Sequence, residues 1–320
     1  MLIKKLFITV CAFVLALVTF ATSTYAWFFL AQQVSVGDFN LTISNDKELL
    51  ISLDGVTYQD SISADDLADV IGDNLQLNNV TTLDGNTFYS SYTHDSKPIK
   101  NRDYISFDIW FRTDSDYWDG VYLYNNISSN YNYAAAMNQE LKGTFVFSKG
   151  INYQTTVDFQ YSQSEFRKQN TINKYYASDA IRIGIKEQYV DSVELVEEDS
   201  REEKDLASFI YDPSENEERG FGKTYGALDM FQRKMNKILT VPDAPETKLY
   251  LSNLQYNYYA IDNTSLCGTF HKATDGYYYA KANVSIWLEG WDADCLDAIY
   301  ADMVIMQLQF KCAIKAQETK

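Results

Sequence analysis

Two short clusters of aspartates carry side chains of the kind that bind calcium, since Ca²⁺ prefers carboxylate and carbonyl oxygens. The candidate ligands are Asp114, Asp116 and Asp119 in the first cluster and Asp292, Asp294 and Asp297 in the second. The first cluster does not fit an EF-hand loop, because Trp118 and Asn125 occupy two of its ligand positions. A turn before a strand and the acidic start of a short helix explain the same residues without a metal. Calcium therefore stays open, and no other cofactor is predicted.

The other chemical signals weigh against an enzyme. The chain lacks the G-x-S-x-G, G-x-x-x-x-G-K-[ST], H-E-x-x-H and C-x-x-C motifs of common hydrolases, nucleotide sites and zinc sites. Its two histidines, His94 and His271, lie in polar stretches without a neighbour that would orient a catalytic base. No two of its 44 acids stand out as a glycosidase pair. We therefore predict a protein that is not an enzyme.

Aromatic side chains offer a binding surface instead. They make up 15% of the chain, and 25 of them are tyrosines. Tyr and Trp combine rigid apolar area with a hydrogen-bonding group, so Trp287 and Trp291 are candidates to face a carbohydrate or another ligand. Aromatic pairs between neighbouring strands, which stabilise a sheet, are the simpler interpretation of the same composition.

The first 26 residues predict export. Two lysines precede an apolar stretch over residues 6–21, and Thr24-Tyr25-Ala26 fits a processing site, which predicts a signal peptide over residues 1–26. The alternative is an uncleaved anchor helix, because the apolar character continues to Leu30 and about 25 such residues can span a bilayer. In that case the protein would contact the membrane only through residues 6–30.

The predicted exported body is strongly acidic. Asp and Glu number 44 against 27 Lys and Arg, a net charge of −17, and losing the two lysines of the signal would give −17 − 2 = −19. Such a surface repels phosphate backbones and anionic lipid heads, so nucleic acid is not expected as a partner. We expect a secreted or cell-surface protein that self-associates and contacts other surface or matrix components.

Export also permits disulfides, and the mature chain would keep three cysteines. Cys312 shares the apolar register of Met306, Leu308 and Phe310 on a predicted strand, so we expect it to be a buried thiol. The remaining two, Cys267 and Cys295, are then the preferred bridge.

Period-two alternation of apolar and polar residues dominates the chain after the signal and predicts about eleven strands. In residues 104–112, for example, Ile105, Phe107, Ile109 and Phe111 alternate with residues that are mostly polar. The strands are predicted at 38–44, 48–53, 104–112, 119–125, 144–148, 155–161, 180–186, 248–252, 255–260, 278–289 and 304–314. Helices do not alternate regularly with these strands, so we predict an all-β, mainly antiparallel sandwich.

Helical signals are few and short. Residues 64–71 follow Ser63, a favourable N-cap, and residues 227–239 carry an apolar stripe that is expected to face the core. The stripe consists of Leu228, Phe231, Met235 and Ile238. Residues 191–219 hold twelve acids against three basic residues, which is typical of a solvated insertion. We predict one domain, 38–320, that includes this insertion.

The two ends of the chain resemble a known group of surface proteins. The stretches concerned are Ser23-Thr24-Tyr25-Ala26-Trp27-Phe28, Val36-Gly37-Asp38-Phe39-Asn40-Leu41-Thr42-Ile43-Ser44, and Val284-Ser285-Ile286-Trp287-Leu288-Glu289-Gly290-Trp291-Asp292-Ala293-Asp294-Cys295. They are similar to the camelysin and TasA group of biofilm-matrix fibre proteins of Gram-positive bacteria and their uncharacterised relatives. The resemblance implies a jelly-roll sandwich at the cell surface, and fibres in which the mature N-terminus completes the sheet of the next subunit.

The residues by themselves also permit strand donation. Residues 27–37 form an apolar extension that a soluble monomer would not leave exposed, and adding it to the open sheet edge of a neighbour would bury it. The donor-strand candidates are Trp27, Phe28, Leu30, Val34 and Val36. The alternative is that the extension folds back on its own domain.

Three functional hypotheses follow. The first is a secreted, non-enzymatic structural protein of the cell surface or biofilm matrix that forms filaments by strand donation. The second is a surface module that binds carbohydrate or another ligand through exposed aromatic residues. The third is an exported hydrolase, including a camelysin-like peptidase, against which the missing metal motif argues.

Overall fold

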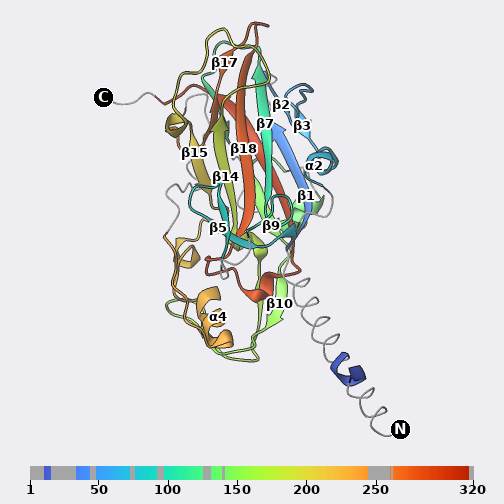
Figure 1. The fold of residues 1–320 in the computed structure, drawn as a ribbon, viewed down its shortest axis with the longest axis vertical. Coiled ribbons are helices and arrows are strands. Elements are labelled where there is room, and N and C mark those ends of the chain that lie inside the picture. The colour runs from blue at the N-terminus through green and yellow to red at the C-terminus, as the bar shows by residue number, and fades with distance from the viewer. Residues whose placement is uncertain are drawn as a thin grey trace.

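The computed structural model describes residues 11–15, 34–43, 48–72, 76–91, 97–124, 131–138, 141–243, 260 and 262–316. Most of these residues belong to β-sheets that are mainly antiparallel, with a few short helices (Figure 1). The predicted all-β, sandwich-like character is therefore confirmed.

One sheet has seven strands and joins the two ends of the domain. Its order is β16 (Leu266–Thr269), β8 (Gly120–Leu123), β19 (Met303–Ala313), β1 (Val34–Ile43) and β3 (Ser61–Ile62), with β4 (Gln76–Leu77) also paired to β1 and β9 (Phe145–Ser148) to β19. Strand β1, near the N-terminus of the domain, and strand β19, at its C-terminus, run parallel from Ser35 opposite Met303 to Ile43 opposite Phe310. The seven-stranded sheet is therefore complete only when the C-terminal strand has paired.

The second sheet has eight strands around the long strand β18. Its order is β15 (Ser208–Tyr211), β14 (Ile181–Gln188), β18 (Tyr278–Glu289), β5 (Asn79–Thr82) and β6 (Phe88–Ser90), with β17 (His271–Lys272) and β7 (Ile105–Thr113) paired to β18 and β2 (Leu49–Ser52) paired to β7. Figure 1 shows β14, β18 and β7 side by side along the length of the molecule. Strand β15 stands at the end of this order.

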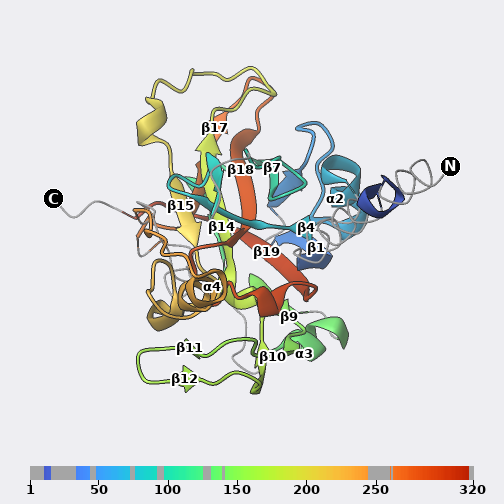
Figure 2. The same cartoon turned by 60° about the horizontal axis from the view of Figure 1, so that its bottom comes forward.

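The remaining elements are short. They are the pairs β10 (Ile151–Gln154) with β13 (Ile172–Tyr175) and β11 (Phe159–Gln160) with β12 (Phe166–Arg167), the helices α2 (Ala64–Ile71), α3 (Tyr133–Asn138) and α4 (Ala227–Met235), and the 3₁₀ turns at Ala177–Ala180, Glu203–Asp205, Glu217–Arg219 and Asp297–Ile299. Figures 1 and 2 place α4 and β10 at one end of the sandwich and β17 at the other.

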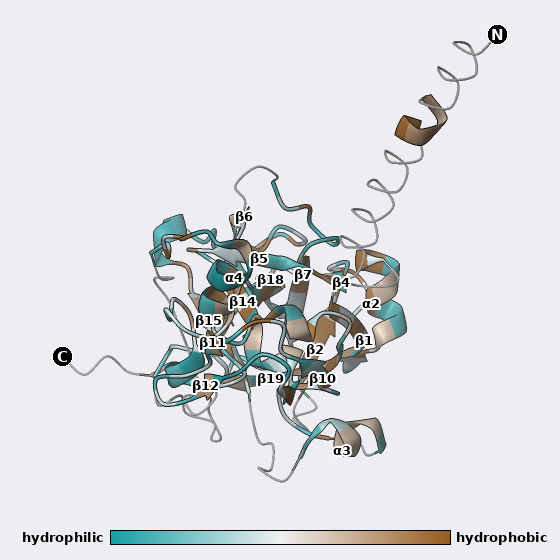
Figure 3. Cartoon of the chain, turned by 90° about the horizontal axis from the view of Figure 1, so that it is seen from below, coloured by the Kyte–Doolittle hydropathy of each residue, from teal (hydrophilic) through white to brown (hydrophobic). Residues whose placement is uncertain are grey.

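Alternation along the strands places the core between the two sheets. On β7 the four predicted apolar residues are all buried, and Phe107 meets Phe39 of β1 edge to face with ring centroids 5.9 Å apart. Phe111 of β7 meets Phe310 of β19 in the same way at 5.0 Å. Hydrophobic colour lies mainly on strands in the middle of Figure 3 and hydrophilic colour mainly on the loops around them. The two sheets thus bury one common core.

Both predicted helices are present, but only part of the apolar stripe predicted for the second one is buried. Helix α2 begins after Ser63 as predicted, with a capping box in which the Ser63 hydroxyl accepts from the backbone N–H of Asp66. Helix α4 ends at Met235, because Asn236 takes a left-handed conformation. Met235 and Ile238 are 57% and 90% exposed, so the expectation that the whole stripe faces the core is wrong for these two.

The acidic segment 191–219 is not simply a solvated insertion. It contains β15, which pairs with β14 from Ser208 opposite Lys186 to Tyr211 opposite Ile183. It also contains Asp212 and Arg219, which are buried. The segment therefore supplies apolar residues that complete the sheet, and Asp212 and Arg219 form ion pairs with Arg182 and Asp294. Most of its other acids are exposed, as predicted for a solvated segment.

The N-terminal predictions fall largely outside the described residues. Residues 11–15 are helical, whereas Trp27, Phe28 and Leu30 lie outside the described part of the chain. Of the helices that the structure describes, none combines the length and the apolar composition needed to cross a bilayer. Val34 and Val36 belong to β1 and pair within their own sheet, so residues 34–37, which were predicted to be part of an extension, belong to the folded body.

Candidate functional site

The two sheets are joined at one side by a buried carboxylate, that of Glu187 near the end of β14. Its Oε2 accepts a hydrogen bond of 2.7 Å from the backbone N–H of Ala207, just before β15. Its Oε1 accepts one of 2.7 Å from the backbone N–H of Thr269 in β16, which belongs to the other sheet. The carboxylate thus takes the place of a backbone acceptor between two strands that do not pair with each other.

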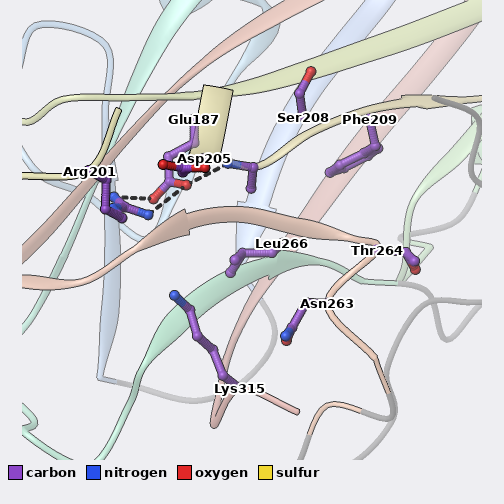
Figure 4. A pocket seen from close by; sticks show the side chains of 10 residues that line it. Glu187, Arg201, Asp205, Ser208, Phe209, Asn263, Thr264, Leu266 and Lys315 are labelled. Atoms are coloured by element: carbon purple, nitrogen blue, oxygen red, sulfur yellow. Dashed lines mark hydrogen bonds and ion pairs between the residues drawn. The ribbon is translucent and has the colours of Figure 1, made fainter. Parts of the chain in front are cut away.

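Arg201 holds this carboxylate from the side of the acidic segment. Its guanidinium donates to both oxygens of Glu187, with Nη2–Oε1 at 2.9 Å and Nη1–Oε2 at 3.1 Å (Figure 4). It also donates through Nε to Asp199 Oδ1 at 2.9 Å. Burial by itself would raise the pKa of Glu187, but Arg201 and the two backbone donors hold it below the ordinary value. Glu187 is therefore an ionised group with four donors.

A cavity of about 340 Å³ opens beside this pair, which is within the size range of small-ligand sites. It is lined by Glu187, Arg201, Asp205, Ala207, Ser208, Phe209, Asn263, Thr264, Leu266 and Lys315. The lining residues come from β14, the acidic segment, β15, β16 and the residues leading into it, and the chain just after β19. Segments distant in sequence therefore form this site.

Lys315 is the second cation of the cavity. In Figure 4 its side chain extends from the chain after β19 toward Leu266 and Arg201. Its Nζ donates to the hydroxyl of Thr269 at 2.7 Å, and Arg201 Nη1 donates to the same hydroxyl at 3.2 Å. Burial, assisted by the positive charge of Arg201, lowers the pKa of Lys315 below its ordinary value. Among the described residues, no carboxylate forms an ion pair with Lys315.

His271 lies at the edge of the same group. Its Nε2 is 3.2 Å from Arg201 Nη2 and 3.3 Å from Asp199 Oδ2, and burial lowers its pKa. The sequence did not reveal this contact, nor the roles of Glu187 and Arg201. One signal was present: Glu187 continues the inward register of Ile183 and Ile185, so a carboxylate stands where the strand pattern calls for an apolar residue.

The predicted calcium ligands of the first cluster do not converge on a common site. Asp114, Asp116 and Asp119 are exposed, and Asp119 accepts from the backbone N–H of Lys315 at 3.0 Å. Over the residues that the structure describes, no three His, Cys, Asp or Glu side chains come together in a group that could hold a metal ion.

The second aspartate cluster pairs with basic side chains. Asp292 contacts Arg182, and Asp294 accepts from Arg219 Nε at 2.7 Å. Asp297 accepts from Lys234 Nζ at 2.6 Å. The sequence showed three acids close together, and the fold directs each of them to a different cation.

Buried acids outnumber buried arginines at this end of the sandwich. Arg182 also pairs with Asp212 at 3.0 Å, and both side chains are buried. Burial raises the pKa of Asp179 and of Glu289 to about 7 each, and that of Asp292 to about 8 against the opposing effect of Arg182. This cluster fixes the loop after β18 to β14 and makes stability depend on pH.

The two candidate ligand-facing tryptophans are buried. Trp287 is fully buried on β18, where Phe88 packs edge to face against it and its Nε1 donates to Glu289 at 3.0 Å. Trp291 is 6% exposed. The prediction is wrong because the strand pattern shows that Trp287 lies on the face opposite the main core, but not that a second small cluster with Val80 and Ile210 covers this face.

The preferred disulfide is absent as well. Cys267 and Cys295 are buried free cysteines. Cys267 lies on β16 near Glu187, whereas Cys295 belongs to the loop that contacts Arg182. Glu187 and Arg182 both lie on β14, where five residues at ~3.3 Å each separate them by about 16 Å. A disulfide needs Cα atoms within about 7 Å. Cys312 is buried on β19, as predicted.

Comparison with known proteins adds no relative: no family model, no curated protein and no solved structure matches the chain.

Proposed function

We propose that the chain is an exported, non-enzymatic structural protein of the cell surface or extracellular matrix, with a jelly-roll-like sandwich that assembles by strand addition. Residues 27–33 of one copy would add to the edge of β15 in the next. The observation that carries the proposal is the position of β15 at the end of the eight-stranded sheet, where among the described residues it pairs with β14 alone.

The register of β15 identifies the backbone groups available at this edge. The N–H of Glu187 donates to the carbonyl of Ala207, and antiparallel pairs alternate between bonded and non-bonded partners. The backbone groups of Ser208 and Ile210 therefore point away from β14. An unpaired edge of this kind is a template for an added strand.

The segment available for donation as a strand consists of the residues before β1. Val34 is buried and pairs with Leu77, so the candidates Val34 and Val36 are already committed to their own sheet. The seven residues from Trp27 to Gln33 would span about 23 Å as a strand, at ~3.3 Å per residue, which is longer than the four-residue edge of β15. Donation would bury Trp27, Phe28 and Leu30 at the copy that accepts them.

Two variants of the mature protein separate donor from acceptor. A protein that starts at Trp27 should form large species in sizing and filaments in negative-stain microscopy, whereas a protein that starts at Val34 should stay monomeric. Ser208→Pro in the longer protein removes the outward N–H without touching the bonds to β14, so it should also block assembly. Ser208→Ala is the matched control and should assemble.

Assembly of the Val34 protein would contradict the donor, and unchanged assembly of a folded Ser208→Pro variant would contradict the acceptor. Export is tested separately by reading the N-terminus of the cell-surface protein by mass spectrometry. A start at Trp27 is expected, and an intact Met1 in a membrane-bound monomer would contradict the proposal.

A further inference from the structure

We propose that the cavity between β15 and β16 binds a small hydroxylated carboxylate, such as a sugar acid, through the ammonium group of Lys315. This inference goes beyond strand addition and does not depend on it, since it concerns a site within one copy of the chain.

The charges around the cavity show why its ligand would be an anion. Glu187 already accepts four hydrogen bonds, two of them from Arg201, and Arg201 divides its remaining donors between Asp199 and Thr269. These groups form a closed set. Lys315 is different, because it lies beside another cation and forms no ion pair with the acids in the described part of the chain.

The hydrogen bonds of Lys315 leave donors for a ligand. An ammonium group has three N–H donors, and within the described part of the chain the acceptor of Lys315 is the Thr269 hydroxyl, which it shares with Arg201. The amide oxygen of Asn263 already accepts from the Tyr122 hydroxyl and the backbone N–H of Ala316. A carboxylate in the cavity would pair with Lys315 in a charge-assisted contact that no described side chain supplies.

The rest of the lining determines what the carboxylate would be attached to. Phe209 and Leu266 give an apolar wall, and Thr264 carries a hydroxyl. Asp205 brings a second negative charge to the lining and would repel a ligand that is anionic throughout, but it can accept from hydroxyl groups. A ring with one carboxylate and several hydroxyls meets these requirements.

To test the inference, calorimetry and NMR would measure the binding of glucuronate, glucose and acetate to the purified protein. Glucuronate should bind, and glucose and acetate should each bind at least about tenfold more weakly, because each lacks half of the recognised groups. Lys315→Gln should weaken glucuronate binding by at least about tenfold. Lys311→Gln is the matched control on β19, with its ammonium over the Tyr124 ring, and should bind like the unchanged protein.

A second readout does not rely on affinity. Glucuronate should slow acetylation of Lys315 by a reagent, measured by peptide mass spectrometry, and should not slow acetylation of Lys311. Equal binding of glucose, unchanged binding by a folded Lys315→Gln variant, absence of glucuronate binding, or lack of protection would each overturn the proposal. None of these outcomes bears on whether the Trp27 protein assembles, so the two proposals fail separately.

Discussion

Replacing Glu187 with Ala should remove the bridge between the two sheets. The residue is 2% exposed, and its carboxylate accepts from the backbone N–H groups of Ala207 and Thr269 and twice from Arg201. A buried N–H without a partner costs about 1–3 kcal/mol, and breaking a buried ion pair costs about 3–5 kcal/mol. Because Arg201 is partly exposed and keeps Asp199, we expect Glu187→Ala to lower the free energy of unfolding by about 3–5 kcal/mol in total.

Urea unfolding followed by tryptophan fluorescence measures this loss. Lys186→Ala is the matched control, since Lys186 is the preceding residue, points to the other face of β14 and pairs with the exposed Glu203 at 2.7 Å. An exposed ion pair contributes about 0–1 kcal/mol, so this variant should unfold almost like the unchanged protein. Equal losses in the two variants would refute the assignment of Glu187 as the bridge.

The bridge should also respond to acid in a definite direction. The pKa of Glu187 is lower in the folded protein than in the unfolded chain, so its contribution to stability is present above the unfolded pKa. That contribution is lost as the pH falls through the folded pKa. The difference in stability between the unchanged protein and Glu187→Ala should therefore shrink in strong acid, and a difference that grows would contradict the argument.

Three further predictions follow from burial and charge. Burial is the main cause that raises the pKa of Asp179 to about 7, so this group lowers the free energy of unfolding as the pH rises from about 4 to 7. At pH 8 Asp179→Asn should therefore raise the free energy of unfolding by up to about 4 kcal/mol, seen as a higher melting temperature, and in acid it should leave both unchanged. A lower melting temperature at pH 8 would contradict this. Without reductant, a thiol reagent should label Cys267 and Cys295 after unfolding, and mass spectrometry that finds them linked would refute the free thiols. Trp287→Ala should cost about 3–5 kcal/mol and the exposed Met235→Ala less than about 0.5 kcal/mol in urea unfolding, and similar values would contradict their burial.

Local patterns were sufficient for much of the secondary structure. The alternation of Ile105 to Phe111 predicted β7 because a strand places successive side chains on opposite faces. Ser63 predicted the start of α2 because a cap needs only residues three positions apart. Cys312 was placed in the core by the same period-two argument. These signals depend on neighbours in the chain, which a sequence displays directly.

Errors arose where a residue's partner is distant in sequence. Trp287 was predicted to face a ligand, but only the fold shows that Phe88 covers it. Asp292 and Asp294 looked like possible metal ligands, and Arg182 and Arg219 neutralise them from other segments.

The sequence by itself determined that this is an all-β protein, because the pleat of a strand imposes a period of two that can be read from neighbouring residues. Only the tertiary structure decided that Glu187, Arg201 and Lys315 share one cavity. These three residues reach it from β14, the acidic segment and the chain after β19. Their meeting follows from the packing of two sheets, since a hydrogen bond or an ion pair depends on distance in space and not on separation along the chain.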